Sequence, residues 1–276
     1  MRKKIIVKGP ALSRSGYGEQ TRFALDSLRS REDLFDIHIM NIPWGNTGHI
    51  ADDSVRGWID ETILKTIAYH NGGGTFDMSL QVTIPNEFEK ICDVNIGYTA
   101  GIETTKVSPE WIDKCNNDVD RVVVVSEHSR KVFENTTYNV QDKTTGQAVD
   151  GWGLQVPCQA VNYCVRGDDV EPLEINFETE KNFLTVCQWG PRKNLDNTIK
   201  WFVETFNDDE TVGLVVKTNL VGDSFVDRTH TEARLKSLLG EFPDRKCKIY
   251  LVHGEISPGQ LNYLYTHETM QGIINL

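Results

Sequence analysis

Two adjacent basic residues, Arg192 and Lys193, stand just before a stretch with helical periodicity in the second half of the chain. The N-terminus of a helix offers unpaired backbone N–H groups and the positive end of the helix dipole, and both attract anions. Two cations at this position add charge-assisted hydrogen bonds of the kind that hold a diphosphate. The segment Trp189–Asn194 is therefore predicted to be an anion site, and a diphosphate suits it.

Polar residues also follow the next two predicted strands of this half. Lys217 ends the first of these strands, and His253 and Gly254 follow the second. The carboxyl ends of parallel strands lie at one edge of a sheet, where open α/β sheets bind their ligands. We therefore expect these residues to share one cleft with Arg192 and Lys193.

The first predicted strand leads into a turn that contains Gly16-Tyr17-Gly18 and precedes a helix. Glycine lets the backbone approach a ligand closely, and a turn of this kind points N–H groups at an anion. A positive φ at Gly16 or Gly18 would support this interpretation, and a plain surface turn is the alternative. A dinucleotide fingerprint fits poorly, because a third glycine is missing and the next strand ends in Met40-Asn41-Ile42 without an acid.

Two further candidates follow strands of the first half. Glu103 lies among small residues in Thr99–Thr105 and could accept hydrogen bonds from sugar hydroxyls, or it could be a solvated carboxylate. His128 follows the strand Arg121–Val125 and could act as an acid or base in the same cleft. An incidental surface histidine is the alternative.

Short β-branched runs alternate with helical stretches along the chain, as is typical of βαβ units and parallel sheets. Three serines, Ser108, Ser126 and Ser257, are predicted helix N-caps. One helical face carries Leu195, Ile199, Phe202, Val203 and Phe206 and should pack on the preceding strand. The expected strands are Lys4–Lys8, Asp36–Ile42, Val94–Tyr98, Arg121–Val125, Phe183–Cys187, Val212–Lys217, Lys248–Val252 and Ile273–Asn275.

The chain length of 276 residues suggests two domains of about 150 residues each. Between the two series of strands lies Arg166–Lys181, which holds six acids around Pro172 and shows little periodicity. This composition predicts a linker. We place the boundary near residue 175, so that the domains are 1–175 and 176–276.

The composition excludes several classes of protein. With 29 basic and 40 acidic residues the net charge is −11, which argues against duplex nucleic acid or an anionic membrane as a partner. No apolar run is long enough to cross a bilayer, and the basic N-terminus is interpreted as a first strand, not a signal peptide. Six scattered cysteines favour reduced thiols, a cytoplasmic location and no metal site.

Three stretches, GIETTKVSPEWIDKCN, DRVVVVSEHSRKVFE and FLTVCQWGPRKNLDNTIKWF, resemble nucleotide-sugar-dependent glycosyltransferases of GT-B architecture, and family 4 in particular, whose members retain anomeric configuration. The resemblance implies an α/β fold with two Rossmann-like, doubly wound parallel-sheet domains and a donor in the cleft between them. It implies that no metal or cofactor is needed besides the nucleotide-sugar substrate. The residues that it implicates are Arg192, Lys193, Gly16 and Gly18 at the donor diphosphate, Lys217, Gly254 and Ile256 at the nucleotide, and Tyr17, Glu103 and Thr104 on the acceptor side.

Two departures from the family pattern stand out. The family's GRL-like triplet is Cys187-Gln188-Trp189 here, so the usual arginine is replaced by an uncharged amide. The family's acidic motif would follow Ile273–Leu276, where this chain ends. We therefore expect a C-terminally truncated, incomplete second domain, with exposed apolar surface, an unpaired strand edge near Ile273–Asn275 and self-association through this half.

The function predicted from these observations is transfer of a sugar from a nucleoside-diphosphate donor to a glycan or other acceptor, with Glu103 and His128 as catalytic candidates. An inactive truncated form is one alternative. A nucleotide-sugar epimerase is another, and it would convert the donor without an acceptor. The remaining alternatives are a non-catalytic module that binds a nucleotide or glycan and, last, a dinucleotide oxidoreductase.

Overall fold

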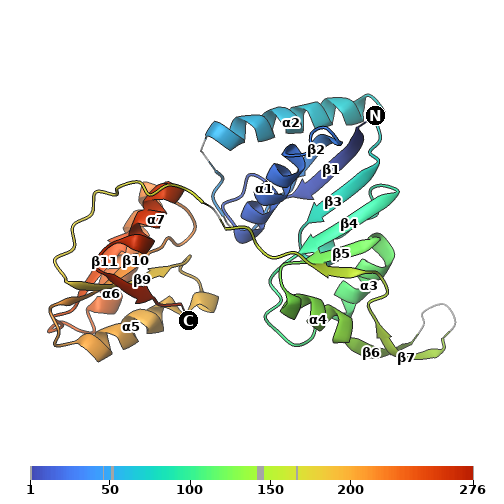
Figure 1. Ribbon diagram of the computed structural model, residues 1–276. Helices are drawn as coiled ribbons and strands as arrows, with labels where there is room; N and C mark the ends of the chain where they lie inside the picture. Colours follow the sequence, from blue (N-terminus) through green and yellow to red (C-terminus); the bar gives the residue numbers. More distant parts are fainter. Residues whose placement is uncertain (1, 46, 51–52, 142–145, 166, 276) are drawn as a thin grey trace. The chain divides into compact units, whose positions relative to one another are not determined.

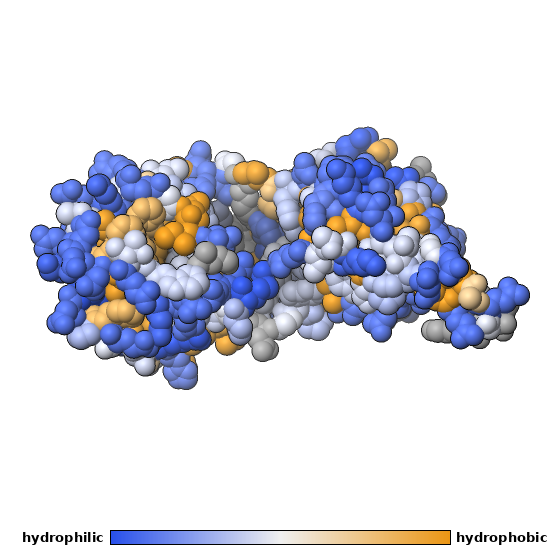
Figure 2. Space-filling view, turned by 90° about the horizontal axis from the view of Figure 1, so that it is seen from below, coloured by the Kyte–Doolittle hydropathy of each residue, from blue (hydrophilic) through white to orange (hydrophobic). Residues whose placement is uncertain are grey.

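The computed structural model describes residues 2–45, 47–50, 53–141, 146–165 and 167–275. The chain forms two compact units, Met1–Val165 and Arg166–Leu276 (Figure 1). The boundary expected near residue 175 therefore falls inside the second unit, and Arg166, the first residue of the expected linker, lies outside the described residues. Hydrophilic residues dominate the face shown in Figure 2, in keeping with the chain's negative mean hydropathy, and apolar patches are scattered among them.

The first unit is built on a six-stranded sheet with the order β2-β1-β3-β4-β5-β8, in which neighbouring strands are parallel. Its strands are β1 (Lys3–Gly9), β2 (Phe35–Asn41), β3 (Met78–Val82), β4 (Val94–Thr99), β5 (Arg121–Val124) and β8 (Cys158–Ala160). Its helices are α1 (Gly16–Arg29), α2 (Asp53–Asn71), α3 (Pro109–Asp118) and α4 (Glu127–Asn135), with a short 3-10 helix, η1 (Pro85–Glu87). An antiparallel hairpin of β6 (Thr137–Gln141) and β7 (Ala148–Gly153) precedes β8.

Helix α2 covers the outer edge of the sheet at β2 (Figure 1). The hydroxyl of Thr66 accepts a hydrogen bond of 2.9 Å from the backbone N–H of Ile39, and the ammonium of Lys65 donates one of 2.8 Å to the carbonyl of Ile37. These side chains satisfy edge groups of β2 that no neighbouring strand reaches, which protects the edge against pairing with another chain.

The second unit is built on a parallel four-stranded sheet with the order β11-β10-β9-β12. Its strands are β9 (Lys181–Val186), β10 (Val212–Lys217), β11 (Lys248–Val252) and β12 (Met270–Ile273). Its helices are η2 (Pro191–Lys193), α5 (Leu195–Phe206), α6 (Phe225–Leu239) and α7 (Pro258–Thr266). As expected, α5 packs on the preceding strand, with Phe202 and Phe206 against Phe183.

Both faces of this second sheet are covered. On one face α5 and α6 pack against Leu214 and Val216. On the other face, α7 packs together with an extended segment, residues 167–180, which we call the acidic strap. Its apolar side chains Leu173, Ile175 and Phe177 join the cluster around Leu184, Val215 and Leu264. The apolar surface that we expected to be exposed on this sheet is therefore covered on its second face by a segment that precedes the sheet in the chain. Ile273 in the outer strand β12 is nevertheless 60% exposed.

The elements expected from the sequence are mostly present. Val212–Lys217 and Lys248–Val252 coincide with β10 and β11, and five other expected strands agree with the structure to within a residue or two. The hydroxyls of Ser108, Ser126 and Ser257 cap α3, α4 and α7, and Ser257 forms a full capping box with Gln260. The last expected strand, Ile273–Asn275, is misplaced, because β12 ends at Ile273.

Candidate functional site

Each sheet reverses its strand order beside its first strand, which defines the place where a ligand is expected. Strand β1 lies between β2 and β3, and β9 lies between β10 and β12. In open α/β sheets, ligands bind at the carboxyl ends of the strands beside such a reversal. The loops that follow β1 and β9 are therefore the first candidates for a site, and they contain the glycine turn and the basic pair.

The loop after β1 is folded by side chains of α1. The buried guanidinium of Arg22 donates hydrogen bonds to the carbonyls of Ala11 and Ser13, at 2.8 and 2.9 Å. The hydroxyl of Ser15 caps the helix and accepts a hydrogen bond of 3.0 Å from the N–H of Gly18. The loop is thus held in one conformation by contacts within the unit itself.

Gly16 and Gly18 both lie in the first turn of α1, and neither has a positive φ. A Cβ on Gly18 would overlap the carbonyl oxygen of Ser13, whereas a Cβ on Gly16 would meet no atom within 4 Å. The absence of a side chain at Gly18 therefore lets the preceding loop pack closely against the helix. Of the two glycines, only Gly16 leaves the helix surface open, so a ligand can come close to the backbone at Gly16 and not at Gly18.

Tyr17 connects the start of α1 to the end of β4. Its hydroxyl lies 2.9 Å from the hydroxyl of Thr99, donates to the carbonyl of Ala100 at 2.9 Å and accepts from the N–H of Ala100 at 3.0 Å. Burial raises the pKa of Tyr17, so it stays protonated. The ring also packs against Trp44, at 4.5 Å between centroids.

His128 and Thr104 bring the third cluster of the first half to the same edge. The Nε2 of His128, in the first turn of α4, lies 3.2 Å from the carbonyl oxygen of Thr104. The Thr104 hydroxyl donates to the carbonyl of Lys106 at 2.6 Å. Glu103 is exposed beside them. The structure thus places Tyr17, Glu103, Thr104 and His128 at the carboxyl edge of one sheet, as the strand pattern predicted.

In the second unit, the basic pair lies in the short helix η2, directly before α5. The N–H of Lys193 donates to the carbonyl of Gly190 at 3.1 Å, and Asn194 takes the left-handed conformation with φ of 48°. Arg192 is exposed and Lys193 half-buried. Among the described residues, the ammonium of Lys193 forms no hydrogen bond or ion pair. Burial raises the pKa of the nearby Cys187 thiol, and the Lys193 charge acts against that rise.

Hydrogen bonds join the three loops at the carboxyl edge of the second sheet. The side-chain amide of Gln188 donates to the carbonyl of Leu220 at 2.8 Å, and the N–H of Trp189 donates to the carbonyl of Asn219 at 2.8 Å. The ammonium of Lys217 donates to the carbonyl of Gly254 at 2.7 Å, where φ is 99°. Lys217 and Gly254 therefore lie together, and the charged ammonium of Lys217 holds the loop after β11 through this hydrogen bond.

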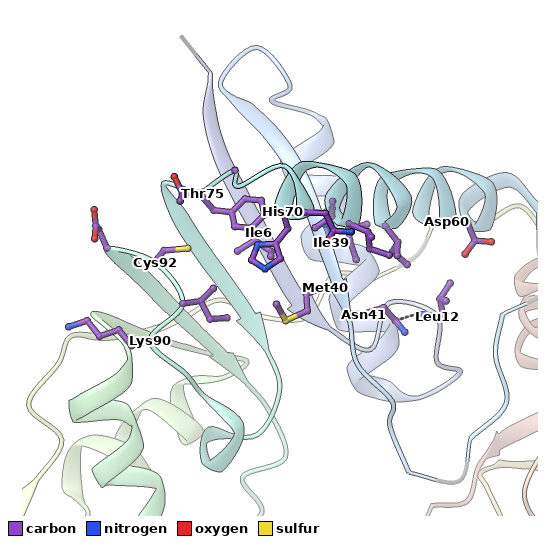
Figure 3. Close-up of a pocket in the computed structure, with 18 residues that line it drawn as sticks. Ile6, Leu12, Ile39, Met40, Asn41, Asp60, His70, Thr75, Lys90 and Cys92 are labelled. Atoms are coloured by element: carbon purple, nitrogen blue, oxygen red, sulfur yellow. Dashed lines mark hydrogen bonds between the residues drawn. The ribbon is translucent and has the colours of Figure 1, made fainter.

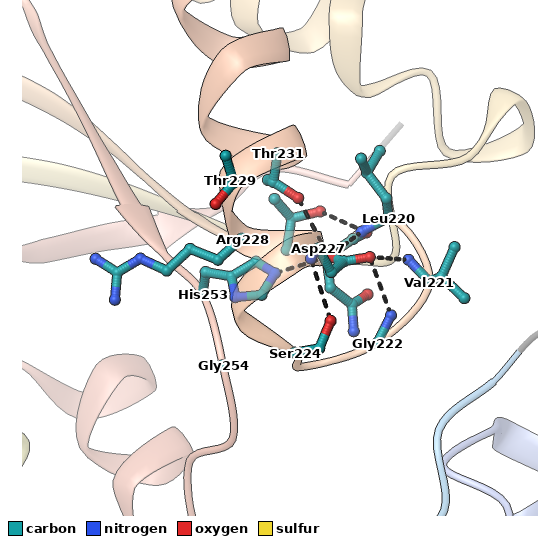
Figure 4. Close-up of polar contacts among 12 residues, drawn as sticks. Leu220, Val221, Gly222, Ser224, Asp227, Arg228, Thr229, Thr231, His253 and Gly254 are labelled. Atoms are coloured by element: carbon teal, nitrogen blue, oxygen red, sulfur yellow. Dashed lines mark hydrogen bonds and ion pairs between the residues drawn. The ribbon is translucent and has the colours of Figure 1, made fainter.

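Asp227 is a buried carboxylate that the sequence analysis did not identify (Figure 4). It accepts hydrogen bonds from the backbone N–H groups of Leu220, Val221 and Gly222, at 3.0, 2.7 and 3.2 Å. The Nε2 of His253 lies 2.7 Å from the same carboxylate, and its side chain is 2% exposed. Because an ionised carboxylate only accepts, this Nε2 carries the hydrogen.

The electrostatics of Asp227 follow from these contacts. Burial by itself would raise the pKa of this carboxyl, but the hydrogen bonds from His253 and from the three backbone N–H groups outweigh it and lower the pKa to about 2. Asp227 thus remains charged and ties the loop after β10 to His253 at the end of β11. The sequence contained one signal for it, the Ser224-x-x-Asp227 pattern of a helix start, and Ser224 caps α6.

No group of His, Cys, Asp or Glu side chains among the described residues could hold a metal ion. None of the helices that the structure describes is both long and apolar enough to cross a membrane.

Comparison with known proteins identifies the fold. No protein-family model matches the chain, and no curated protein matches its sequence. The apo structure of OtsA matches 95% of this chain and 76% of its own, with a TM-score of 0.53 and 10% identity. The structure of Anabaena HepE in complex with UDP-glucose matches 94% of this chain and 71% of its own, with a TM-score of 0.47 and 12% identity. The chain therefore has the predicted α/β fold of GT-B type, with two parallel sheets.

Proposed function

We propose that this protein is a glycosyltransferase that moves a sugar from a nucleoside-diphosphate donor to an acceptor. The observation that carries the proposal is the position of Arg192 and Lys193. They lie in the loop after β9, beside the reversal of strand order in the second sheet, where doubly wound sheets bind nucleotides. The fold shared with OtsA and the sequence resemblance to glycosyltransferases support the same conclusion.

The donor side of the reaction is assigned to the second unit. Lys193 and Arg192 hold the diphosphate and stabilise the charge that develops on it as the bond to the sugar breaks. Gly254 and Ile256 bind the nucleotide, and Lys217 fixes the loop that presents them through its bond to the Gly254 carbonyl.

The acceptor side is assigned to the carboxyl edge of the first sheet. Gly16, which the resemblance assigns to the donor diphosphate, offers an open helix start at the same edge, and Gly18 gives the loop its shape. Tyr17 fixes the end of β4, and Thr104 and Glu103 follow in the next loop. Glu103 and His128 are the candidates for proton transfer. We further propose membership of family 4, retention of anomeric configuration, and transfer without a metal ion.

The test compares Lys193→Ala with Lys200→Ala. Both substitutions remove one positive charge, but Lys200 lies within α5 and pairs with Glu241. A charge-assisted hydrogen bond is worth about 1.5–3 kcal/mol, so Lys193→Ala should weaken binding of UDP, GDP or ADP by about tenfold to a hundredfold. Lys200→Ala should bind as the wild type does. Titration calorimetry measures the affinities, and thermal unfolding checks that both variants are folded.

The same experiment separates the alternatives. Equal nucleotide affinity in the wild type and Lys193→Ala would remove this residue from the site. Nucleotide binding without turnover of UDP-, GDP- or ADP-sugars would indicate a binding module. Conversion of the donor sugar in the absence of any acceptor would indicate an epimerase. Release of the nucleoside diphosphate that depends on an added acceptor is the result expected of a transferase.

A further inference from the structure

The first sheet has a hollow on its face beside α2 (Figure 3). Its volume is about 980 Å³, within the usual range for small-molecule sites. The connection from β3 to β4, residues 83–93, contains only the short helix η1 where the neighbouring crossovers contain α2 and α3. A helix of full length is therefore missing from this connection, and the hollow lies between α2 and the shorter segment.

The floor of this groove is apolar and its rim is polar. Ile6, Ile39 and Met40 line it from β1 and β2, and Ile63 and Ile67 line it from α2. Met40 is 38% exposed and Ile67 51% exposed, so apolar surface remains open to water here. The exposed polar residues that line it are His70, Asn71, Thr75, Lys90 and Asp93.

The groove runs along the length of the strands. It extends from Phe76 and Cys92, which precede β3 and β4, to Asn41 at the end of β2. The seven residues of β2 span about 23 Å, which gives the approximate length of the hollow. An extended peptide would bury backbone N–H and C=O groups against isoleucines that cannot pair with them. An aliphatic chain has no such groups.

One end of the groove reaches the loop that the proposed function uses. Leu12 lines this end, and its N–H donates to the side chain of Asn41 at 3.1 Å. Leu12 belongs to the turn between β1 and α1, and Gly16 begins the helix four residues later. A molecule that fills the groove therefore ends at the carboxyl edge of the sheet, beside the acceptor-side residues.

We propose that this groove binds an aliphatic chain carried by the sugar acceptor, whose hydroxyl group lies at the carboxyl edge near Leu12. The acceptor is thus an amphipathic molecule with a polar head and one long apolar chain. This inference rests on the proposed glycosyl transfer for the identity of the occupant as acceptor. The groove itself is a property of the first unit alone.

The test is a series of hexyl, octyl and decyl β-D-glucosides, titrated below their micelle concentrations into the full chain by calorimetry without donor. Burial of one methylene is worth up to about fourfold in affinity, and at least about twofold in a groove with one open side, so decyl should bind about fifteenfold or more tighter than hexyl. Ile67→Glu places a charge in the groove and should abolish this dependence on chain length. Leu64→Glu is the matched control, since Leu64 lies on the same helix, is 66% exposed and does not line the groove.

Equal affinity for all three glucosides would overturn the groove proposal. An equal loss of affinity in Ile67→Glu and Leu64→Glu would overturn it as well. Circular dichroism confirms that the variants are folded. The transfer reaction is then measured separately with each glucoside as acceptor and UDP-, GDP- and ADP-sugars as donors. Chain-length-dependent binding without any transfer would leave the groove as a binding site but refute its role for the acceptor, whereas the nucleotide-binding test of Lys193→Ala decides the transferase proposal separately. A transfer rate that does not depend on the length of the alkyl chain would support the transferase function and refute the groove as the site that binds the acceptor's chain.

Discussion

Asp227→Asn should free the loop between β10 and α6. In the wild type, the carboxylate accepts hydrogen bonds from three successive backbone N–H groups, at Leu220, Val221 and Gly222, and from His253. An asparagine retains one acceptor oxygen but turns a donating NH₂ toward groups that are themselves donors. A buried donor that faces another donor loses its partner, and the loop is expected to open.

The size of the effect follows from the pKa of Asp227. Hydrogen bonds lower it from 3.8 to about 2 in spite of burial. That difference corresponds to roughly 2–3 kcal/mol, or about sixtyfold in an equilibrium constant. The unfolded carboxyl takes up a proton near pH 4 and the folded one only near pH 2. The stabilisation is therefore complete above about pH 4 and is lost as the pH falls toward 2, with about half of it left at pH 3.

Hydrogen exchange of the peptide that contains Leu220–Gly222 measures this opening. At pH 7, Asp227→Asn should lower the protection of these amides by about sixtyfold. The matched control is Glu232→Gln on the same helix, which removes an exposed partner of Arg228 and should leave the loop protected. Unfolding by urea should show the difference between wild type and Asp227→Asn shrinking between pH 4 and pH 3. Two results would contradict this prediction. One is amide protection in Asp227→Asn equal to that of the wild type, and the other is a difference in the free energy of unfolding that does not change between pH 4 and pH 3.

Substitutions at three other contacts give further tests. Gly18→Ala should destabilise the first unit, because its Cβ meets the Ser13 carbonyl, while Gly16→Ala should be tolerated; equal melting temperatures would contradict this. Tyr17→Phe leaves both backbone groups of Ala100 without their partner and should cost about 1–3 kcal/mol in urea unfolding. Phe177→Ala should cost about 1–3 kcal/mol and expose the acidic strap to limited proteolysis, and an unchanged cleavage rate would show that its ring does not anchor the strap.

Much of the architecture could be predicted because the buried strands are apolar and the helix starts carry local signals. Strand β3 was missed for a physical reason. Its residues Ser79 and Gln81 are fully buried, so the strand does not look apolar. Ser79 donates to Asn95 at 2.8 Å, and Gln81 donates to the carbonyl of Glu89 at 2.6 Å, and these partners lie in segments that only the fold brings close.

The acidic strap was misinterpreted for the opposite reason. Leu173, Ile175 and Phe177 alternate with Glu174 and Asn176, a period of two that indicates an extended segment with one buried side. The density of acids concealed this pattern. The basic pair of the candidate site was found because it stands just before a helix whose apolar periodicity is visible in the sequence. Asp227 was not found in this way, because its hydrogen-bond partners come from the loop after β10 and from His253 after β11, and a local sequence pattern cannot show them.

The strap also determines when the second half of this protein can fold. Glu171 hydrogen-bonds to Ser257 at the start of α7, 86 residues later, and Asn262 bonds to the carbonyl of Asp168 across 94 residues. A ribosome adds about 5–20 residues per second, so the strap leaves the ribosome roughly 4–17 s before its partner helix exists. During that interval its three apolar side chains lack Leu264 of α7, which completes their cluster, and we expect the neighbouring acids to keep the strap in water. We therefore expect the charge that resembles a linker in the sequence to keep an uncompleted layer of the core from aggregating during synthesis.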